Sequence, residues 1–224
     1  LFAPAIIALL ALPASSARAE DAAALTVTVA PIPDAVWTAM QGVSWHETVP
    51  GCPSCACPPR DELALLTVPY RDLDGALRSG RMIVAATVAD DVAAAMQAIF
   101  DSDAFRFAEI ELVDAYDGDD DKSMAANNTS AFNCRAVTGG SKLSAHGDGT
   151  AIDINPIQNP FVKGTTTLPP AGRSFDEPAE RRPGVPGVIV ADGVVVSAFE
   201  AVGWQWGGDW TSIKDYQHFS ADGR

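Results

Sequence analysis

Apolar and polar residues alternate most regularly over residues 151–155, Ala-Ile-Asp-Ile-Asn, and this alternation predicts a β-strand. Successive side chains of a strand point to opposite faces, so Ile152 and Ile154 are expected to face a core while Asp153 points away from it. Two glycines lie before the strand, and their backbone freedom permits a tight turn that returns the imidazole of His146 to the carboxylate of Asp153. The pattern therefore predicts a nitrogen ligand and an oxygen ligand on neighbouring stretches of backbone.

The hydrophobic pattern also predicts two helices. Residues 89–102 carry apolar side chains at positions i, i+4, i+7 and i+8, and two aspartates lie near the positive end of the helix dipole. A shorter helix is predicted over residues 34–40, with Asp34 suited to cap it. Runs rich in β-branched residues predict strands at residues 63–68, 80–85, 107–116, 188–190 and 194–196, and a last strand that carries His218 and Phe219.

Turns and loops are predicted for three stretches. Asp192-Gly193 suits a primed turn that would join the two valine runs into a hairpin, and a short helix is predicted after it over residues 197–203. Residues 163–187 are rich in Pro, Gly and Thr and predict a long surface loop, either flanking a substrate groove or mobile. The acidic run 117–121 is interpreted as a solvated turn, with a calcium loop as the alternative, although the bidentate glutamate of such a loop is missing.

Length and charge limit the possible functions. A chain of 224 residues can bury one sizeable core, and nothing in its pattern asks for a second one. The formal net charge of −14 argues against binding to nucleic acid or to an anionic membrane surface, because both favour clusters of Lys and Arg. The charge is interpreted as that of a secreted protein's surface, and it indicates no particular reaction.

The first residues of the chain have the pattern of a secretory signal peptide. Residues 1–14 are almost wholly apolar, and Ala17-Arg18-Ala19 supplies the small-x-small ending, so we expect a signal peptide over residues 1–19. The apolar run is short for a membrane span and is interrupted by two prolines. No stable span is therefore expected after cleavage, and an uncleaved membrane anchor is the alternative.

Only three histidines are present to complete a metal site. His146 and Asp153 supply a nitrogen and an oxygen of the kinds that zinc takes in proteins, and a third ligand is needed. His218 is the candidate, in the segment Asp215-Tyr216-Gln217-His218. His46 stands alone in a loop and is interpreted as a surface or hydrogen-bonded histidine.

The motif Ser-x-His-x-x-Gly-x-Ala-x-Asp, followed much later by an acidic residue three positions before a histidine, resembles the zinc D-Ala-D-Ala carboxypeptidase and L-alanyl-D-glutamate endopeptidase family. These LAS-type peptidoglycan peptidases share their fold with the hedgehog signalling domain. The motif is matched at Ser144, His146, Gly149, Ala151 and Asp153. Further resemblance to the endolysin-type branch lies in residues 127–135, 154–156, 159–161 and 203–210. The resemblance covers most of the chain from about Leu63 to Phe219.

The resemblance implies a fold, a metal and a general base. It implies an α+β class, with a small central antiparallel sheet bearing the ligands and helices on its flanks, and a zinc peptidase domain over residues 63–224. One Zn²⁺ ion would be held by His146, Asp153 and His218, with a fourth position open as in catalytic zinc sites. Asp215 would act as the general base, because it lies three residues before a ligand.

Other residues receive roles from the same resemblance. Arg135 lies upstream of the Ser-x-His motif, where the family has an arginine, and would stabilise the developing oxyanion; a surface or salt-bridged arginine is the alternative. Ser144 would hydrogen-bond the substrate or order its loop. Trp206 would contact the substrate, although aromatic core packing is an alternative for each tryptophan of the Trp/Gly cluster. Asn155 and Asn159 are expected to order the loop that follows the metal strand.

The four cysteines are expected to form disulfides, which export permits. Cys52, Cys55 and Cys57 cluster among prolines in residues 20–62, a stretch expected to be an N-terminal covering segment, while Cys134 stands alone. A second zinc site would need a second pair of ligands, which is missing. Two disulfides, or one and a free pair, are expected. A bridge from Cys134 to the cluster would tie the covering segment to the active-site loop, and spacing leaves its partner open.

These residues together predict a secreted zinc metallopeptidase that hydrolyses amide bonds of peptidoglycan stem peptides outside the cytoplasm, as a monomer. Two specificities stay open. A D-alanyl-D-alanine carboxypeptidase would need a cationic group for the free carboxylate, and an L-alanyl-D-glutamate endopeptidase would need a more open groove. The alternative from another class is a non-catalytic zinc module that binds the cell wall or a partner, against which the presence of both Asp215 and Arg135 argues.

Overall fold

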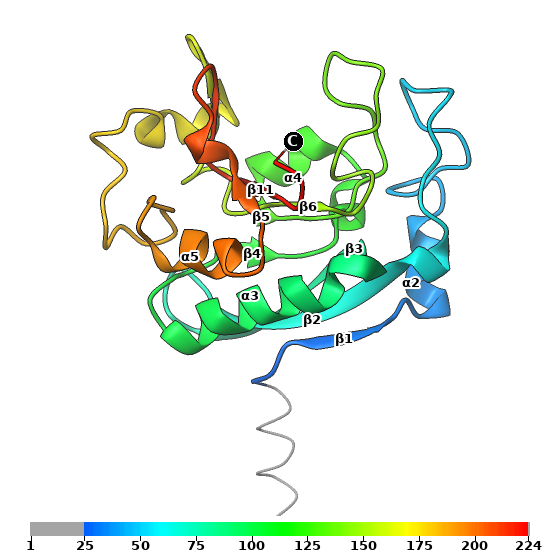
Figure 1. The fold of residues 1–224 in the computed structure, drawn as a ribbon, viewed down its shortest axis with the longest axis horizontal. Helices are drawn as coiled ribbons and strands as arrows, with labels where there is room; N and C mark the ends of the chain where they lie inside the picture. The colour runs from blue at the N-terminus through cyan, green and yellow to red at the C-terminus, as the bar shows by residue number, and fades with distance from the viewer. Residues whose placement is uncertain (1–24, 224) are drawn as a thin grey trace, which may run out of the picture.

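Helices and short strands are mixed along the chain, which confirms the predicted α+β class (Figure 1). The computed structural model describes residues 25–223, so the signal peptide expected at residues 1–19 lies outside them. Within this range the strands form three small antiparallel sheets of three strands and one short parallel pair, instead of one central sheet. No helix in the described range is long and apolar enough to cross a membrane.

The longest strands form the base of the fold (Figure 1). They pair in the order β1-β2-β3 and comprise β1 (Thr28–Pro31), β2 (Leu63–Arg71) and β3 (Leu77–Ala85). The strands predicted at residues 63–68 and 80–85 are confirmed and are longer than expected. Helix α3 (Ala89–Ser102) has the predicted bounds and packs its buried Val92, Met96 and Ile99 into the main core beside β2. The predicted short helix is α2 (Asp34–Met40), although Pro33 rather than Asp34 occupies its N-cap.

A second sheet lies above this base and carries two of the three candidate metal ligands, Asp153 and His218 (Figure 1). Its order is β6-β11-β9, with the bounds β6 (Ala151–Asp153), β11 (His218–Ser220) and β9 (Gln205–Trp206). The strands predicted around Ile152 and at the C-terminus are therefore confirmed. Ile152 and Ile154 are fully buried in the main core, as their alternation predicted. Phe219 pairs with Ile152 and stacks on Phe199, so apolar packing fixes the sheet that holds the polar residues.

Smaller elements surround the two sheets. The third sheet has the order β10-β7-β8, and the parallel pair is β4-β5. Their bounds are β4 (Glu109–Ile110), β5 (Asn128–Thr129), β7 (Phe161–Lys163), β8 (Thr166–Leu168) and β10 (Lys214–Asp215). Short 3-10 helices cover Arg60–Glu62, Ala86–Val88, Val113–Tyr116, Pro170–Phe175 and Gly207–Asp209. The single strand predicted over residues 107–116 is thus mostly wrong, and the long loop predicted over residues 163–187 begins with ordered structure.

The hairpin predicted around Asp192-Gly193 is wrong. Residues 188–190 form no strand, and the second valine run begins α5 (Val194–Glu200), which starts three residues earlier than the helix expected at residue 197. Its buried side chains, among them Val195 and Phe199, belong to the same core cluster as α3. β-branched residues favour strands only weakly, and burial of an apolar face against a helix decides the conformation here.

The acidic run at residues 117–121 begins as the predicted turn, over residues 117–119, and ends in the first two residues of a helix. The carboxylate of Asp119 accepts a hydrogen bond from the backbone N–H of Lys122 and caps α4 (Asp120–Ala125). Negative side chains at a helix N-terminus are stabilised by the free N–H groups and the helix dipole. The run therefore has a structural explanation without a calcium ion, and Asp120 within it pairs with Arg135.

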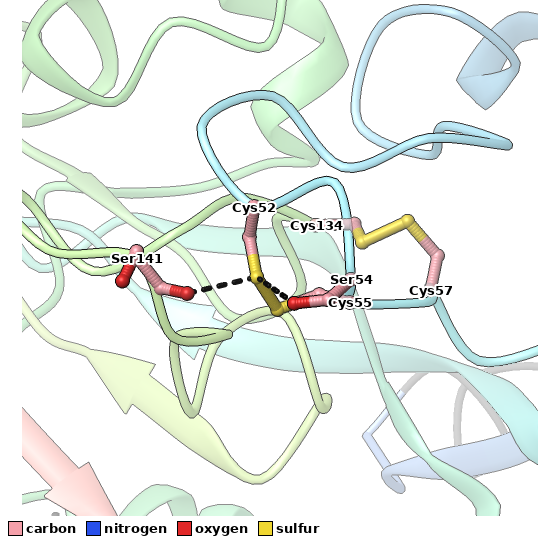
Figure 2. Close-up of a disulfide and its surroundings, with 6 residues drawn as sticks. All are labelled: Cys52, Ser54, Cys55, Cys57, Cys134 and Ser141. Carbon is pink, nitrogen blue, oxygen red and sulfur yellow. Dashed lines mark hydrogen bonds between the residues drawn. A yellow bond between two sulfur atoms is a disulfide. The ribbon is translucent and has the colours of Figure 1, made fainter.

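Both disulfides form within the described residues (Figure 2). Cys52 bonds to Cys55, and Cys57 bonds to Cys134, so the expected bridge between Cys134 and the cluster is confirmed. A second core cluster packs around these cysteines, with Met40 and Phe132 among its members. The covering segment is thus fastened, covalently and by apolar packing, to the stretch that leads into the candidate site.

Candidate active site

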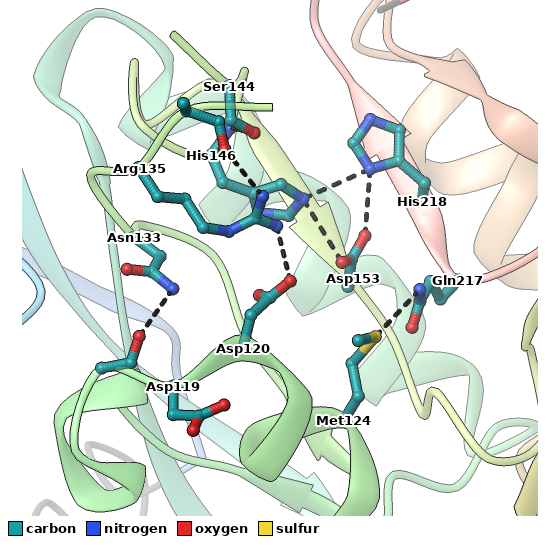
Figure 3. A network of polar contacts seen from close by, with 12 residues as sticks. Asp119, Asp120, Met124, Asn133, Arg135, Ser144, His146, Asp153, Gln217 and His218 are labelled. Carbon is teal, nitrogen blue, oxygen red and sulfur yellow. Dashed lines mark hydrogen bonds and ion pairs between the residues drawn. The ribbon is translucent and has the colours of Figure 1, made fainter. Parts of the chain in front are cut away.

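Two strands bring Asp153 and His218 together. In the antiparallel pair of β6 and β11, Asp153 lies directly opposite His218, although the two residues are far apart in the sequence. Nδ1 of His218 is 3.0 Å from Oδ1 of Asp153 (Figure 3). Both backbone groups of Asp153 also bond to Ser130, which holds β6 on its other edge. Strand register therefore sets the position of two of the three expected ligands.

His146 completes the group from the turn before β6. Its Nε2 is 3.3 Å from Oδ2 of Asp153 and 3.3 Å from Nδ1 of His218 (Figure 3). Its Nδ1 lies 2.8 Å from the carbonyl oxygen of Ala131, to which it donates, and this leaves the lone pair of the neutral ring on Nε2. The turn requires Gly149, whose φ is +73° and where a Cβ would lie 2.6 Å from the backbone nitrogen of Ala85. The prediction that glycine allows His146 to return to Asp153 is confirmed.

The three donors fit a zinc ion in number, type and spacing. Ligand atoms about 2.0–2.1 Å from zinc and at tetrahedral angles lie about 3.3 Å from one another. The three facing pairs of ligand atoms lie 3.0, 3.3 and 3.3 Å apart. All three side chains are buried, and within the described residues they are the one group suited to hold a metal. Two imidazoles and one carboxylate with room for a further ligand are typical of catalytic rather than structural zinc sites.

The electrostatics of Asp153 agree with a cation-binding role. Burial alone would raise the pKa of this carboxyl. The two histidines beside it outweigh burial and hold the pKa of Asp153 well below its usual range. The carboxylate therefore stays ionised at neutral pH, as a metal ligand must.

Asp215 lies in the same pocket, at the end of β10. Burial, and next the negative charge of Asp153, raise the pKa of Asp215 to about 7. Its Oδ1 is buried and has no hydrogen-bond partner within residues 25–223. A buried carboxylate oxygen without a partner is costly in a folded protein, and such groups occur at catalytic sites. Asp215 therefore has the environment of a proton-transfer group.

Arg135 reaches the pocket from the segment that follows Cys134. Its Nη2 donates to Oδ2 of Asp120 at 2.7 Å, and both side chains line the pocket (Figure 3). Its Nε is buried and has no partner among the described residues. Arg135 therefore both forms a salt bridge and lines the pocket, and its Nε–H is left without an acceptor within residues 25–223.

A pocket of about 630 Å³ joins these groups. It is lined by the three ligands, Arg135 and Asp215. Its remaining lining residues are Asp120, Met124, Val137, Thr138, Lys142, Leu143, Ser144, Ala145, Phe161, Lys163, Leu168, Trp210, Ile213 and Gln217. A cavity of this volume is large enough for part of a peptide.

The two expected substrate contacts have different outcomes. Ser144 lines the pocket and is nearly buried; its Oγ accepts a hydrogen bond from the backbone N–H of His146, so it orders the ligand loop. Trp206 does not line the pocket, and its side chain follows the alternative of aromatic core packing. Its ring lies in the core against Phe219, and its Nε1 donates to the carbonyl of Tyr216. Trp210 lines the pocket instead, with its ring centre 5.6 Å from that of His218.

Sequence reasoning missed three polar or aromatic residues of the pocket. Asp120 belongs to the acidic run, Trp210 to the Trp/Gly cluster, and Gln217 directly precedes a ligand. Gln217 is almost fully buried, and its Oε1 has no partner within the described part of the chain. A polar side chain beside a ligand was the signal for Gln217, whereas no local signal distinguishes Asp120 or Trp210 from their neighbours.

Comparison with known proteins finds one family whose model matches part of the chain. Residues 138–221 match the model of a protein family described as D-alanyl-D-alanine carboxypeptidase. The resemblance to this peptidase family is confirmed. No curated protein and no solved structure matches the chain.

The peptidase match includes most, but not all, of the pocket. It contains the three ligands and Asp215, whereas Asp120 and Arg135 precede it. Zinc is the usual metal of this peptidase family, and the donor set described above suits it. The match supports a peptidase and leaves open which bond is cut.

Proposed function

We propose that this protein is a secreted zinc metallopeptidase that hydrolyses amide bonds in peptidoglycan stem peptides. The observation that carries the proposal is the convergence of two imidazoles and one carboxylate at 3.0–3.3 Å in a pocket that also holds Asp215 and Arg135. The match of residues 138–221 to a peptidase family supports the same chemistry. Two disulfides and the signal-like N-terminus support export.

His146, Asp153 and His218 would hold one zinc ion. When bound, zinc supplies a Lewis acid that lowers the pKa of water from ~15.7 toward ~7 and polarises a carbonyl oxygen. The protein's own contribution is to keep Asp153 ionised and to present Nε2 of His146 through the bond of its Nδ1 to Ala131. Burial of the three side chains keeps competing water away from them.

Asp215 would act as the general base and then as the general acid. Its carboxylate would take a proton from the attacking water and pass it to the nitrogen of the departing amine, because hydrolysis requires both transfers. A pKa of about 7 suits a group that must accept and return a proton near neutral pH. Its unpartnered Oδ1 leaves a lone pair for this task.

Arg135 would donate hydrogen bonds to the oxygen of the scissile carbonyl. The charge on this oxygen grows in the transition state, and a fixed donor aimed at it lowers the barrier by about 2.7–4 kcal/mol. The ion pair with Asp120 restricts the guanidinium, and the Cys57–Cys134 disulfide anchors the backbone next to it. Tetrahedral collapse then releases the amine without a covalent link between peptide and enzyme.

The test is incubation of purified protein and zinc with muropeptides of defined stem, followed by mass spectrometry of the products. Release of D-Ala identifies a carboxypeptidase, and cleavage of the bond between L-Ala and D-Glu identifies an endopeptidase. Asp215→Asn should keep bound zinc and lose ~10²–10⁴-fold in rate. Asp209→Asn is the matched control, because Asp209 is an exposed aspartate outside the pocket lining.

Two results would contradict the proposal. Intact muropeptides after long incubation with the zinc-loaded wild type would favour the non-catalytic zinc module. A rate for Asp215→Asn equal to that of Asp209→Asn would remove Asp215 from the mechanism.

A further inference from the structure

Two of the four lysines lie on segments that rise on opposite sides of the pocket. Lys142 belongs to the loop between Ala136 and Leu143, which pair as an isolated bridge, and Lys163 ends β7 in the β7–β8 hairpin. In Figure 1 the loop near residue 140 and the yellow hairpin stand on either side of β6 and β11. Both lysines line the pocket that contains the three ligands.

These two lysines differ from the others in what they contact. Nζ of Lys122 pairs with Asp117 at 2.8 Å, and Nζ of Lys214 donates to the carbonyl of Gly208 at 2.8 Å. Neither Lys142 nor Lys163 has a side-chain hydrogen bond or ion pair with any residue in the described range 25–223. Acidic residues outnumber basic ones by 29 to 15 in this chain, so most lysines would be expected to have an acidic partner nearby. Two lysines without such a partner at the same pocket are therefore unusual for this composition.

None of the acids that line the pocket pairs with either lysine. Asp120 pairs with Arg135, Asp153 lies between the two histidines, and the Oδ1 of Asp215 is buried without a partner within residues 25–223. The two ammonium groups therefore add positive charge at the mouth that no acid of the pocket neutralises. An anionic group on a ligand would find its counter-charge there.

The loop of Lys142 lies against the Cys52–Cys55 disulfide. The carbonyl oxygen of Ser141 lies 2.9 Å from Sγ of Cys52, next to the Cys52–Cys55 disulfide (Figure 2). Within the loop, the backbone N–H of Val137 donates to the carbonyl of Lys142 at 2.9 Å. On the other side, β7 pairs with β10, the strand of Asp215, which fixes Lys163 relative to the proposed base.

We propose that Lys142 and Lys163 form a carboxylate-binding subsite, so that the preferred substrate is a peptide whose departing residue keeps a free α-carboxylate. This inference rests on the proposed function and deepens it. Both candidate bonds meet the condition. A terminal D-Ala ends in a free α-carboxylate, and in the stem peptide D-Glu continues through its γ-carboxyl, which leaves its α-carboxylate free. One subsite would therefore serve either bond.

The test compares a peptide acid with its amide. Stem-peptide analogues are prepared with the α-carboxylate of the departing residue either free or amidated, and kcat/KM is measured for each. For the wild type we expect the acid to be cut about tenfold faster than the amide. Lys142→Gln and Lys163→Gln should each reduce this ratio about threefold, as partly exposed ion pairs do, and the double variant should abolish the preference. Added salt should reduce the ratio of the wild type and leave that of the double variant unchanged.

Lys122→Gln is the matched control, because Lys122 is exposed and lies outside the pocket lining, and it should keep the wild-type ratio. An unchanged acid-to-amide ratio in the double variant would overturn the inference while leaving the peptidase activity intact. If the wild type cuts neither peptide, the proposed function fails instead. Calorimetric titration of the acid and amide peptides then decides the subsite, since equal affinities in the wild type and the double variant would refute it.

Discussion

Asp120→Asn tests whether Arg135 is held in place by its carboxylate partner. The Nη2–Oδ2 distance is 2.7 Å, and the side chains of Arg135 and Asp120 are 23% and 25% exposed. A fully exposed pair would contribute less than about 1 kcal/mol, whereas loss of one partner of a charged hydrogen bond costs about 1.5–3 kcal/mol. The partial exposure places this pair between the two cases, at about 1–2 kcal/mol. If that energy is lost in the transition state, the rate falls by roughly 5- to 30-fold.

Three variants separate positioning from folding. Arg135→Ala removes the donor itself and should cost about 10²–10³ in kcat, more than Asp120→Asn. Asp120→Glu keeps the carboxylate and should recover part of the rate. Asp121→Asn changes the exposed neighbour on the same helix and should behave like the wild type.

The assay measures kcat, KM and bound zinc on one muropeptide. Asp120→Asn should lower kcat, leave KM within about twofold and leave the zinc content unchanged, because the arginine acts on charge that develops in the transition state. An Asp120→Asn rate within twofold of the wild type would refute the positioning role. Loss of zinc in this variant would show that the ion pair instead supports the ligand loop.

Three further predictions concern stability. Gly149→Ala should lower the free energy of unfolding by more than Gly139→Ala in thermal or denaturant melts, because both glycines have φ near +72° but only Gly149 has backbone within 2.6 Å of the added Cβ; equal losses would contradict this. Arg181→Lys should destabilise the protein by about 2–4 kcal/mol and lower its melting temperature, because the guanidinium donates to four oxygens and lies 3.7 Å from the ring centre of Tyr216. An unchanged melting temperature would contradict this. Removal of the Cys57–Cys134 disulfide by paired serine substitutions should lower the free energy of unfolding by about 4.5 kcal/mol, because it releases a loop of 77 residues. Removal of the Cys52–Cys55 disulfide, whose cysteines are 3 residues apart, should cost only about 1.6 kcal/mol. An equal loss of stability for the two would refute the estimate.

The metal ligands could be predicted from the sequence because their signals are local. His146, Gly149 and Asp153 fall within one turn and strand, where spacing and alternation limit the geometry. His218 was identified because few histidines are present and an acidic residue precedes it by three positions. The sequence did not predict that His218 would lie directly opposite Asp153, because strand register depends on packing partners such as Phe219 and Ile152.

Residues whose role depends on burial were predicted less well. Trp206 and Trp210 occur in one cluster with similar neighbours, and only the packing of Phe219 places one in the core and the other at the pocket. The same holds for the second valine run, which forms α5 because its apolar side packs with α3. The asparagines behave as expected: Asn159 accepts from the backbone N–H of Ile189 and donates to the carbonyls of Ile154 and Asn155, which orders the loop after the metal strand.

Hydrolysis is expected to require one metal ion held by His146, Asp153 and His218. The most direct measurement is a titration in which metal-free protein receives zinc in steps, with bound zinc and muropeptide cleavage measured at each step. Activity should rise in proportion to bound zinc and reach its plateau at one ion per chain, and His218→Ala should bind little zinc and stay inactive. Cleavage by the metal-free protein, or full zinc binding by His218→Ala, would contradict it.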